Sequence, residues 1–473
     1  MGDPRSFIEH KRKNAGNRPA GERLTDFAEV EQTLNSHDRL IQASRCMDCG
    51  VPFCHWACTT HSRIPEWQDA MFCERWDEAI DILQDTNDLP EITGRICPAL
   101  CEKSCVLAIS DEPVTIRENE AALAEKAFDL GLMQPKPPRI TTGKKVAVIG
   151  SGPAGITVAN RLNQEGHQVT VFEKDEMPGG LLTYGIPDFK LNKRVVSRRI
   201  ELLEKEGIRF ETNVYAGKDI TARELTGKYD AICLAVGARE PRDLQVPGRE
   251  LTGIWFAMDF LSRQNDIIAG KTFSGRQRIS AKGKHVVVIG GGDTGSDCVG
   301  TANRQGARSV TQVEILPKPP EKRPADNPWP YWPQTLRTSS SHEEGCTRLW
   351  SLQATRIKGA NGQVREIELT RLDWNRRTKK GAPMDTGEKT SLKADMILLA
   401  MGFVHPVKDK LLKDLNIRLH QRGYIDTETL DRKIFIAGDA ATGPSLVVKA
   451  IDSGQKTAWK MNEYLNSLSK DKR

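Results

Sequence analysis

Two stretches of this chain share one pattern: a short apolar run, a glycine-rich turn, small residues and a second apolar run. The turns are Gly150-Ser-Gly-Pro-Ala-Gly155 and Gly290-Gly-Gly-Asp-Thr-Gly295. The flanking apolar runs are Val146–Ile149 and Gln168–Phe172 for the first, and Val286–Ile289 and Ser309–Ile315 for the second. This order is typical of a βαβ unit. The chain is therefore predicted to be an α/β protein with two Rossmann-like nucleotide-binding domains on parallel sheets.

Each glycine of the first turn has its own task. Gly150 permits the tight turn, Gly152 lets the backbone approach a pyrophosphate, and Gly155 lets the helix pack closely on the strand. The helix N-terminus then offers backbone N–H groups to the phosphates. Glu173 ends the second strand, where a carboxylate can accept hydrogen bonds from ribose hydroxyls. A glycine turn alone can be purely structural, but the strand, helix, spacing and acidic residue together predict a dinucleotide site.

The second turn predicts a second dinucleotide site, at Gly290, Gly292, Asp293, Thr294 and Gly295. Glu314 lies within its second strand, and an acidic residue there favours the 2′-hydroxyl of NAD. Lys318, Lys322 and Arg323 follow, and basic residues favour the 2′-phosphate of NADP, although a solvated loop would also explain them. We expect NADPH here, with Lys318 and Arg323 as ligands. Two dinucleotide sites imply two electron carriers, most economically FAD in the first and NADPH in the second.

No side chain is assigned a catalytic role, because hydride transfer between bound cofactors requires no protein acid or base. No Cys-x-x-Cys pair lies beside the expected flavin region, which disfavours a dithiol relay. Cys73, Cys233 and Cys298 stand alone and are interpreted as core thiols.

Seven of the 11 cysteines lie in two tight clusters. They are Cys46, Cys49, Cys54 and Cys58, then Cys97, Cys101 and Cys105. Such spacing suits 4Fe-4S clusters or a zinc site, and each needs four ligands. Seven thiols leave one site a ligand short, which Glu118 or Glu120 would complete. Iron–sulfur is favoured, since a flavin that accepts two electrons needs a one-electron exit, and zinc remains the alternative.

Charge and hydropathy limit the partners. The formal net charge is +6 from 69 basic and 63 acidic residues, without a basic stripe, so we expect no nucleic-acid partner. The longest apolar runs fall far short of the ~20 residues of a membrane helix, so we expect no membrane partner. The N-terminal MGDPRSFIEHKRK lacks the apolar core of a secretory signal, which favours a cytoplasmic location and metal-bound cysteines over disulfides.

Four segments are expected along the chain. Residues 1–142 lack a glycine-rich turn and form a helical domain, with helices over Ala70–Leu83 and Glu118–Leu130. Residues 143–282 form the first part of the FAD domain, 283–397 the NADPH domain, and 398–473 the second part of the FAD domain. The prolines at 135, 137 and 138 mark the first linker.

Further motifs carry a family resemblance. They are Gly94-Arg-Ile-Cys-Pro98, Gly179-Gly-Leu-Leu-Thr-Tyr-Gly-Ile-Pro187, Asn327-Pro-Trp-Pro330, Ser339-Ser-Ser-His-Glu-Glu-Gly345, Ile434-Phe-Ile-Ala-Gly-Asp439 and Gly443-Pro-Ser-Leu-Val-Val448. With the cysteines and both turns, they resemble the small (β) subunits of NADPH-dependent glutamate synthases over essentially the whole chain. The resemblance implies a helical domain with two 4Fe-4S clusters and glutathione-reductase-like FAD and NADPH domains, the second inserted in the first.

The resemblance also implies the cluster ligands, through the related module of dihydropyrimidine dehydrogenase. One cluster is held by Cys46, Cys49, Cys54 and Cys105. The other is held by Cys58, Cys97, Cys101 and Glu120, with Glu118 as the alternative fourth ligand. The FAD contacts it implies are Gly150, Gly152, Pro153, Ala154, Gly155, Glu173, Gly180, Leu181, Lys190, Gly438, Asp439, Leu446 and Val447.

In function, the resemblance implies the electron-input subunit of glutamate synthase. Electrons pass from NADPH through FAD and the clusters to the FMN of a large subunit, which also carries a 3Fe-4S cluster and a glutaminase and makes L-glutamate from L-glutamine and 2-oxoglutarate. This chain has no room for a (β/α)8 barrel of ~250 residues, so we expect no glutamate from it alone.

Two other hypotheses compete. The chain would alternatively be an input subunit of ferredoxin:NADP transhydrogenase, sulfide dehydrogenase or pyrimidine reductase type, which the segment 339–345 disfavours. A redox sensor or scaffold with purely structural nucleotide sites is the third hypothesis.

Overall fold

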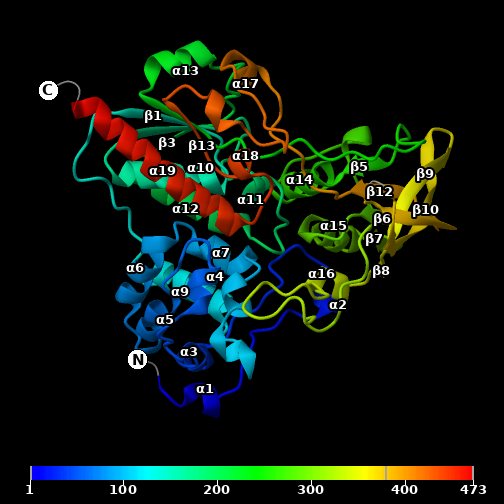
Figure 1. Cartoon of the computed structure of the whole chain (residues 1–473), viewed down its shortest axis with the longest axis horizontal. Helices are drawn as coiled ribbons and strands as arrows, with labels where there is room; N and C mark the ends of the chain where they lie inside the picture. The colour runs from blue at the N-terminus through cyan, green and yellow to red at the C-terminus, as the bar shows by residue number, and fades with distance from the viewer. Residues whose placement is uncertain (1–2, 379–380, 471–473) are drawn as a thin grey trace.

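The computed structural model describes residues 3–378 and 381–470, which form a helical N-terminal domain and two parallel-sheet domains. In Figure 1 the helical domain lies below the first sheet, and the second sheet lies to one side of both. The α-helices of the helical domain are α1 (Ser6–Glu9), α2 (Ala20–Arg23), α3 (Ser36–Ser44), α4 (Phe53–Ala57), α5 (Ile64–Phe72), α6 (Trp76–Thr86), α7 (Pro90–Ile96), α8 (Leu100–Lys103) and α9 (Ile116–Asp129). No helix in the described part of the chain is both long and apolar enough to span a membrane.

The helix expected over residues 70–83 is wrong, because the chain breaks between α5 and α6. Glu74 adopts a left-handed backbone with φ 56°, and the Arg75 N–H bonds back to the Ala70 carbonyl at 2.9 Å. The turn lets both helices bury apolar side chains in one core, including Met71 and Ile80. Cys73 is exposed at this turn, which corrects its interpretation as a core thiol. Cys233 and Cys298 are buried, as expected, and α9 confirms the second expected helix.

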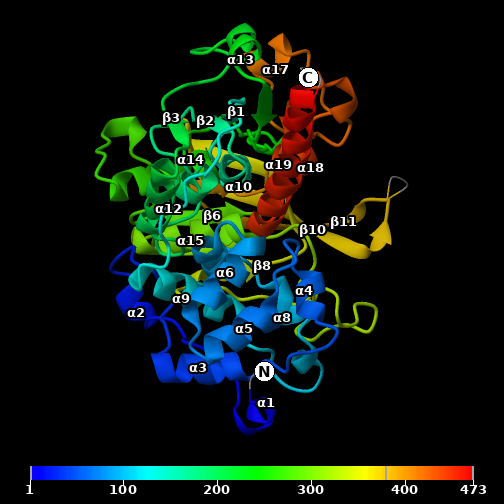
Figure 2. The ribbon, with the colours of Figure 1, turned by 90° about the vertical axis from the view of Figure 1, so that its left-hand side faces the viewer.

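The first sheet has five parallel strands in the order β13-β4-β1-β2-β3. They are β1 (Lys145–Ile149), β2 (Gln168–Phe172), β3 (Arg209–Glu211), β4 (Ala231–Leu234) and β13 (Ile434–Ile436). Its helices are α10 (Pro153–Gln164), α11 (Leu181–Tyr184), α12 (Lys193–Lys205), α13 (Ala222–Lys228), α17 (Lys410–Asp414), α18 (Asp439–Thr442) and α19 (Val447–Lys470). Because β13 returns beside β4, this domain is discontinuous in sequence. Figure 2 shows α19 beside α10, and Gly454 permits the approach, since a Cβ there would lie 2.8 Å from the Ala154 carbonyl oxygen.

The second sheet repeats this layout, with parallel strands in the order β5-β12-β6-β7-β8. They are β5 (Ile254–Phe256), β6 (His285–Ile289), β7 (Ser309–Val313), β8 (Thr347–Leu349) and β12 (Met396–Leu399), with helices α14 (Ala257–Ile268), α15 (Asp293–Arg304) and α16 (Ser340–Glu343). The insertion of one nucleotide domain in the other is thereby confirmed. The chain joins the second sheet at β5, earlier than the expected start at residue 283, because β5 covers the outer edge of β12.

A third sheet, absent from the sequence expectations, is antiparallel in the order β11-β10-β9. It consists of β9 (Leu352–Ala360), β10 (Gln363–Arg377) and β11 (Pro383–Lys393), at the far side of the second sheet in Figure 1. Ile357, Ile367 and Leu369 bury one of its faces against Val287 and Leu399 of the second sheet. Alternating apolar and charged residues in β10 match a sheet with one buried face.

The loop that follows β7 ties the second sheet domain to the helical domain. The Trp329 indole Nε1 donates to the Cys105 carbonyl at 3.3 Å, and the Ser104 hydroxyl donates to the Pro330 carbonyl at 2.6 Å. The Trp329 ring lies 4.6 Å from the Phe53 ring, centroid to centroid. The motif Asn327–Pro330 therefore contacts the cysteine-rich domain directly.

Candidate functional site

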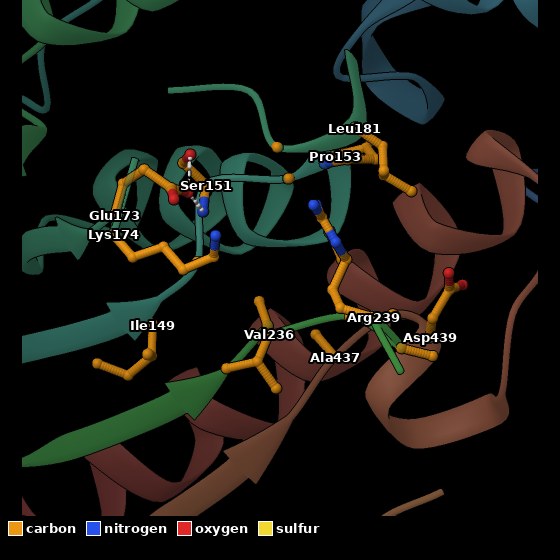
Figure 3. A pocket seen from close by; sticks show the side chains of 18 of the residues that line it. Ile149, Ser151, Pro153, Glu173, Lys174, Leu181, Val236, Arg239, Ala437 and Asp439 are labelled. Carbon is orange, nitrogen blue, oxygen red and sulfur yellow. Dashed lines mark hydrogen bonds between the residues drawn. The ribbon is translucent and has the colours of Figure 1, made fainter. Parts of the chain in front are cut away.

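A cavity of about 300 Å³ lies at the carboxyl edge of the first sheet (Figure 3). The structure gathers around it eleven of the thirteen residues expected to contact FAD. These are Gly150, Gly152, Pro153, Ala154, Glu173, Gly180, Leu181, Gly438, Asp439, Leu446 and Val447. The other two, Gly155 and Lys190, lie outside its lining. The residues from Gly438 onward join this lining because β13 pairs with β4, so that α18 and α19 begin beside the glycine turn.

The glycines of the first turn allow very close backbone packing. A Cβ on Gly150 would lie 2.5 Å from the Ala235 carbonyl oxygen, and φ at this residue is +102°. A Cβ on Gly155 would lie 2.0 Å from the Gly150 carbonyl oxygen. Gly155 thus seats α10 on the turn, and the N-terminus of α10 faces the cavity, where its N–H groups favour an anion.

Glu173 is held in this cavity by Ser151. Its carboxylate accepts hydrogen bonds from the Ser151 backbone N–H at 3.1 Å and from the Ser151 hydroxyl at 2.5 Å, drawn as dashed lines in Figure 3. The same hydroxyl accepts from the Gly179 N–H at 2.9 Å. Sequence reasoning missed Ser151, because it fills a variable position of the turn. Glu173 is only 4% exposed, so the carboxylate in the lining of this cavity is buried.

Asp439 faces the same cavity from the start of α18. Burial raises the pKa of its carboxyl to about 6, while hydrogen bonds from Ser445 oppose the shift. The Ser445 hydroxyl donates to Asp439 Oδ1 at 3.0 Å. Arg239 also lines the cavity, and its guanidinium projects into it in Figure 3. Ser445 lies within the motif Gly443–Val448, of which only Leu446 and Val447 were expected to contact the flavin. Arg239 belongs to no motif, so sequence reasoning had no signal for it.

A second, larger cavity of about 920 Å³ adjoins the first. Both cavities are lined by Ile186, Ser445, Leu446 and Val447. From there the second cavity extends to Asp293 in the second glycine turn and to Cys97 in the cysteine-rich domain. The expected flavin, nicotinamide and cluster regions therefore border two adjoining cavities.

Lys190 lies in this second cavity rather than in the first. Its Nζ is 2.5 Å from Asp297 Oδ1 on α15, and the lysine and aspartate are largely buried. Burial alone lowers the pKa of Lys190, but the charges of Asp297 and Asp293 outweigh it, and the net shift is upward. The structure thus places a fixed cation between α15 and the residues shared by the two cavities.

The second turn repeats the contacts of the first. A Cβ on Gly290 would lie 2.2 Å from the Ala400 carbonyl oxygen, and a Cβ on Gly295 would lie 2.3 Å from the Gly290 carbonyl oxygen. Gln312 on β7 donates its amide to the Gly290 carbonyl at 2.8 Å. Gly292 has no atom near an added Cβ, which leaves its backbone open to a ligand. Asp293 and Thr294 follow in the first turn of α15.

The two basic residues expected to bind NADPH contact different groups. Lys318 is about half exposed, with its Nζ 3.9 Å from Glu321 and 5.8 Å from the Trp350 ring centroid. Arg323 donates from Nη1 to the carbonyls of Asn327, Pro328 and Tyr331, at 3.1, 3.3 and 2.7 Å. Its guanidinium therefore holds its own loop.

The structure brings clustered cysteines together at two places in the helical domain. Cys46, Cys49, Cys54 and Cys105 line one small cavity of about 20 Å³ between α4 and the residues after α8. Cys58, Cys97, Cys101 and Glu120 form the second group, in which the nearby Glu120 carboxylate is one of the influences that raise the pKa of each thiol. Thr93 and Asn87 donate hydrogen bonds to Glu120, the latter at 3.0 Å. Glu118 turns elsewhere, accepting from the Ala15 N–H at 3.0 Å and lying 3.6 Å from Arg39.

The donor set fits iron–sulfur clusters. Burial raises the pKa of Cys46 and of Cys97 to about 12, so these thiols stay protonated unless a cation replaces the proton. Thiolates are the ligands that iron–sulfur clusters require. In residues 3–378 and 381–470, no group of three or more His, Cys, Asp or Glu side chains is arranged for a metal ion. The cluster assignment therefore rests on the grouped thiols and on the comparisons below.

Two family models match parts of the chain. Residues 144–454 match the pyridine nucleotide-disulphide oxidoreductase family, and this single match spans both parallel-sheet domains. Residues 23–131 match the family described as dihydropyrimidine dehydrogenase domain II, 4Fe-4S cluster. The second match covers all seven clustered cysteines and Glu120.

Several curated proteins are similar along nearly the whole chain. The glutamate synthase (NADPH) small chain of Mycobacterium tuberculosis strain H37Rv is 45% identical over 480 residues, which cover 99% of this chain and 97% of that one. The glutamate synthase (NADPH) small chain of Bacillus subtilis is 42% identical, covering 99% of both chains. The glutamate synthase (NADH) of Saccharomyces cerevisiae is 41% identical, over 98% of this chain and 22% of that longer protein.

Among solved structures, FprA from Mycobacterium tuberculosis in complex with NADPH has a similar fold. Its TM-score is 0.54 at 19% identity, over 70% of this chain and 86% of that one. At this identity the likeness concerns the fold of the two sheet domains.

Proposed function

This chain belongs to the family of glutamate synthase small chains, and from this we propose that it is the electron-input subunit of a glutamate synthase. It is an NADPH-dependent flavoprotein oxidoreductase with a 4Fe-4S domain. We propose further that two clusters carry its electrons to the FMN of a large subunit. That subunit would also hold a 3Fe-4S cluster and a glutaminase, and would make L-glutamate from L-glutamine and 2-oxoglutarate in the cytoplasm.

The observation that carries this proposal is the pair of adjoining cavities between the three domains. Leu446 and Val447 border the expected flavin cavity and also the larger cavity that reaches Asp293 and Cys97. Nicotinamide bound at the second turn and a cluster bound by Cys97 would therefore approach the flavin region through one cavity. This arrangement suits a protein that receives electrons from one side and releases them on the other.

Bound FAD would supply two-electron acceptance from NADPH and one-electron release to the clusters. The chain supplies binding and orientation. The N-terminus of α10 favours the pyrophosphate, and Glu173 and Asp439 offer carboxylates to sugar or ribityl hydroxyls. Lys190, fixed by Asp297, keeps a positive charge beside the residues that border both cavities. The second turn offers the N-terminus of α15 to the coenzyme pyrophosphate.

The test is anaerobic affinity purification of the chain from its native cells, with mass identification of the co-purifying proteins. We expect a large FMN-containing subunit, and glutamate formation from glutamine, 2-oxoglutarate and NADPH by the complex. The chain alone should reduce an artificial dye with NADPH and form no glutamate. Omission of 2-oxoglutarate is the control for glutamate released by a glutaminase alone.

Two results would contradict the proposal. If the purified chain retained no FAD or did not oxidise NADPH, the electron-input function would be wrong. If the co-purifying protein reduced ferredoxin or a pyrimidine, the cofactors would stand and the glutamate assignment would fall.

A further inference from the structure

Four side chains gather beside the second glycine turn, at the carboxyl edge of the second sheet. Gln312 on β7 pairs in parallel register with Arg348 on β8. Successive strand residues point to opposite faces, so Glu314 shares the face of Gln312, and Trp350 shares the face of Arg348. The ladder continues past the strand ends, because the Glu314 N–H bonds to the Leu349 carbonyl at 2.8 Å. This face also carries the turn, since Gln312 bonds to Gly290.

Glu314 lies directly against the turn. A Cβ on Gly291 would fall 1.1 Å from Glu314 Oε2, so only glycine leaves room for this carboxylate. Burial raises the pKa of Glu314, and the nearby charge of Arg348 opposes that shift. Within the described residues no hydrogen bond reaches the carboxylate. A half-buried carboxylate at the end of this strand is placed to accept hydrogen bonds from the ribose hydroxyls of a dinucleotide.

Arg348 brings the opposite charge to the same place. Its Cζ lies 5.0 Å from the Trp350 ring centroid, and its Nη1 donates to the Arg337 carbonyl at 3.1 Å. Lys318 approaches the same ring at 5.8 Å. Arg348 is partly buried and is held by the indole and by one carbonyl, which leaves other guanidinium N–H groups for a ligand.

We propose that Arg348 and Glu314 are opposed determinants of coenzyme choice, so that this chain accepts NADH as well as NADPH. Arg348 binds the 2′-phosphate of NADPH, and Glu314 binds the free ribose hydroxyls of NADH. A 2′-phosphate gains a charge-assisted pair with the guanidinium but is repelled by the carboxylate. The inference rests on the proposed function only in that the second turn binds a nicotinamide coenzyme. Relatives named for NADPH and for NADH occur at similar identity, 45% and 41%.

The test compares two fragments that differ only in the 2′-phosphate, 2′,5′-ADP and 5′-AMP, titrated calorimetrically into the full holoprotein. We expect Arg348→Gln to weaken 2′,5′-ADP at least about tenfold and to leave 5′-AMP within about twofold. Glu314→Gln should weaken 5′-AMP severalfold and tighten 2′,5′-ADP. Arg348→Lys keeps the charge without the planar fork and should fall between wild type and Arg348→Gln. These measurements need no electron transfer.

Matched controls remove the same charges elsewhere. Arg308→Gln is placed just before β7, at the end away from the turn, and Glu204→Gln is on α12 of the other sheet domain. Both should leave the two fragments unchanged. In steady-state dye reduction, the ratio of kcat/KM for NADPH to that for NADH should fall in Arg348→Gln and rise in Glu314→Gln.

Three results would overturn the inference. These are equal weakening of the two fragments by Arg348→Gln, loss of 2′,5′-ADP in Lys318→Gln but not in Arg348→Gln, and a wild-type protein that oxidises no NADH. Failure of the proposed function gives a different pattern, because a protein that binds both fragments but supports no glutamate formation with a large subunit retains the coenzyme site.

Discussion

Glu118 and Glu120 lie two positions apart on α9, and a single helix turns them to different surroundings. Glu120 is half-buried and accepts hydrogen bonds from Thr93 and Asn87. It lies beside the thiols of Cys58, Cys97 and Cys101. Glu118 instead accepts a hydrogen bond from the Ala15 N–H. We predict that Glu120→Gln loses about half of the bound iron, because one of the two proposed clusters would lack a ligand. Glu118→Gln should keep it. Iron analysis and low-temperature EPR of the reduced proteins would measure this, and equal iron in both variants would contradict it.

Ser151 is the residue on which the position of Glu173 depends. Its hydroxyl donates to Glu173 and accepts from Gly179, so it joins the turn, the end of β2 and the loop before α11. Ser151→Ala leaves a buried carboxylate and an N–H without that partner, at a cost of about 1–3 kcal/mol. We predict weaker FAD retention, by roughly tenfold or more in Kd, measured by flavin release on dilution. Ser197→Ala, on the exposed face of α12, is the control. Unchanged retention would mean that Glu173 does not need this hydroxyl.

At the scale of elements, Gly94 sets the distance between α7 and α9. A Cβ on Gly94 would lie 2.5 Å from the Ala121 backbone nitrogen, so any side chain must push α9 away. Cys97 follows α7 and Glu120 lies on α9. Both belong to the second thiol group, by which we mean Cys58, Cys97 and Cys101 with the carboxylate of Glu120 beside them. We predict that Gly94→Ala costs about 1–3 kcal/mol of stability and lowers iron occupancy of that group. Gly227→Ala, in a helix with open space around it, should be neutral or stabilising. Equal melting temperatures and iron contents would refute the prediction.

The short helix α16 is fixed to the second sheet through His342. The Nδ1 atom accepts from the Ser339 N–H at 3.1 Å, and Nε2 lies 2.8 Å from Gln312 Oε1. Burial first, and then the charges of Arg348 and Lys190, lower the pKa of His342 to about 4. Because the pKa of His342 is lower in the folded than in the unfolded state, neutral His342 contributes to the free energy of unfolding. This contribution is fully present above about pH 6.5 and is lost as pH falls toward 4. Discounted for partial exposure, it amounts to about 1–2 kcal/mol.

We therefore predict that the melting temperature of wild type falls more between pH 7.5 and pH 5 than that of His342→Gln. Glutamine keeps a polar side chain at this position and does not titrate in this range. Calorimetric scans of the two proteins at both pH values would measure the difference. The same pH dependence in both would show that His342 does not contribute.

The elements also show where sequence reasoning reaches its limit. Both βαβ units were predictable, because a glycine turn between a strand and a helix is a local pattern. The break at Glu74 was not, since the apolar spacing continues across it and only tertiary packing selects the left-handed turn. Arg348 was missed for another reason. It reaches the second turn only because β8 pairs with β7, and no local pattern in the sequence marks that pairing.

At the scale of the whole molecule, the sequence motifs predicted which residues meet but not the space between them. The two turns follow from spacing, whereas the division of the thiols into two groups came only from the family resemblance. The contact between the two cavities does not follow from spacing. It depends on Ile186, Leu446 and Val447, which line both cavities and which the sequence alone marks only as apolar core residues. The domain arrangement places Cys97 at this cavity, whereas Cys46, Cys49, Cys54 and Cys105 lie away from it against Phe53. The second thiol group is therefore the one nearer to the flavin region.

This arrangement predicts that loss of the second cluster separates two half-reactions. Cys97→Ser replaces one expected ligand in the second thiol group, which borders the larger cavity, and it lies in neither glycine turn. NADPH should still bleach the flavin absorbance under anaerobic conditions, at a rate within about threefold of wild type, because that step uses only the two sheet domains. Glutamate formation by the complex with the large subunit should fall at least about a hundredfold, since the electrons have no exit.

Cys73→Ser is the matched control, because Cys73 is exposed and lies outside both thiol groups. It should retain iron, flavin reduction and glutamate formation. Flavin content of each variant must equal that of wild type, which separates a lost cluster from a misfolded chain. If Cys97→Ser lost flavin reduction and glutamate formation to the same degree, the helical domain would act on the nicotinamide step itself. If it lost neither, the electrons would leave the flavin by a path that does not pass through the second thiol group.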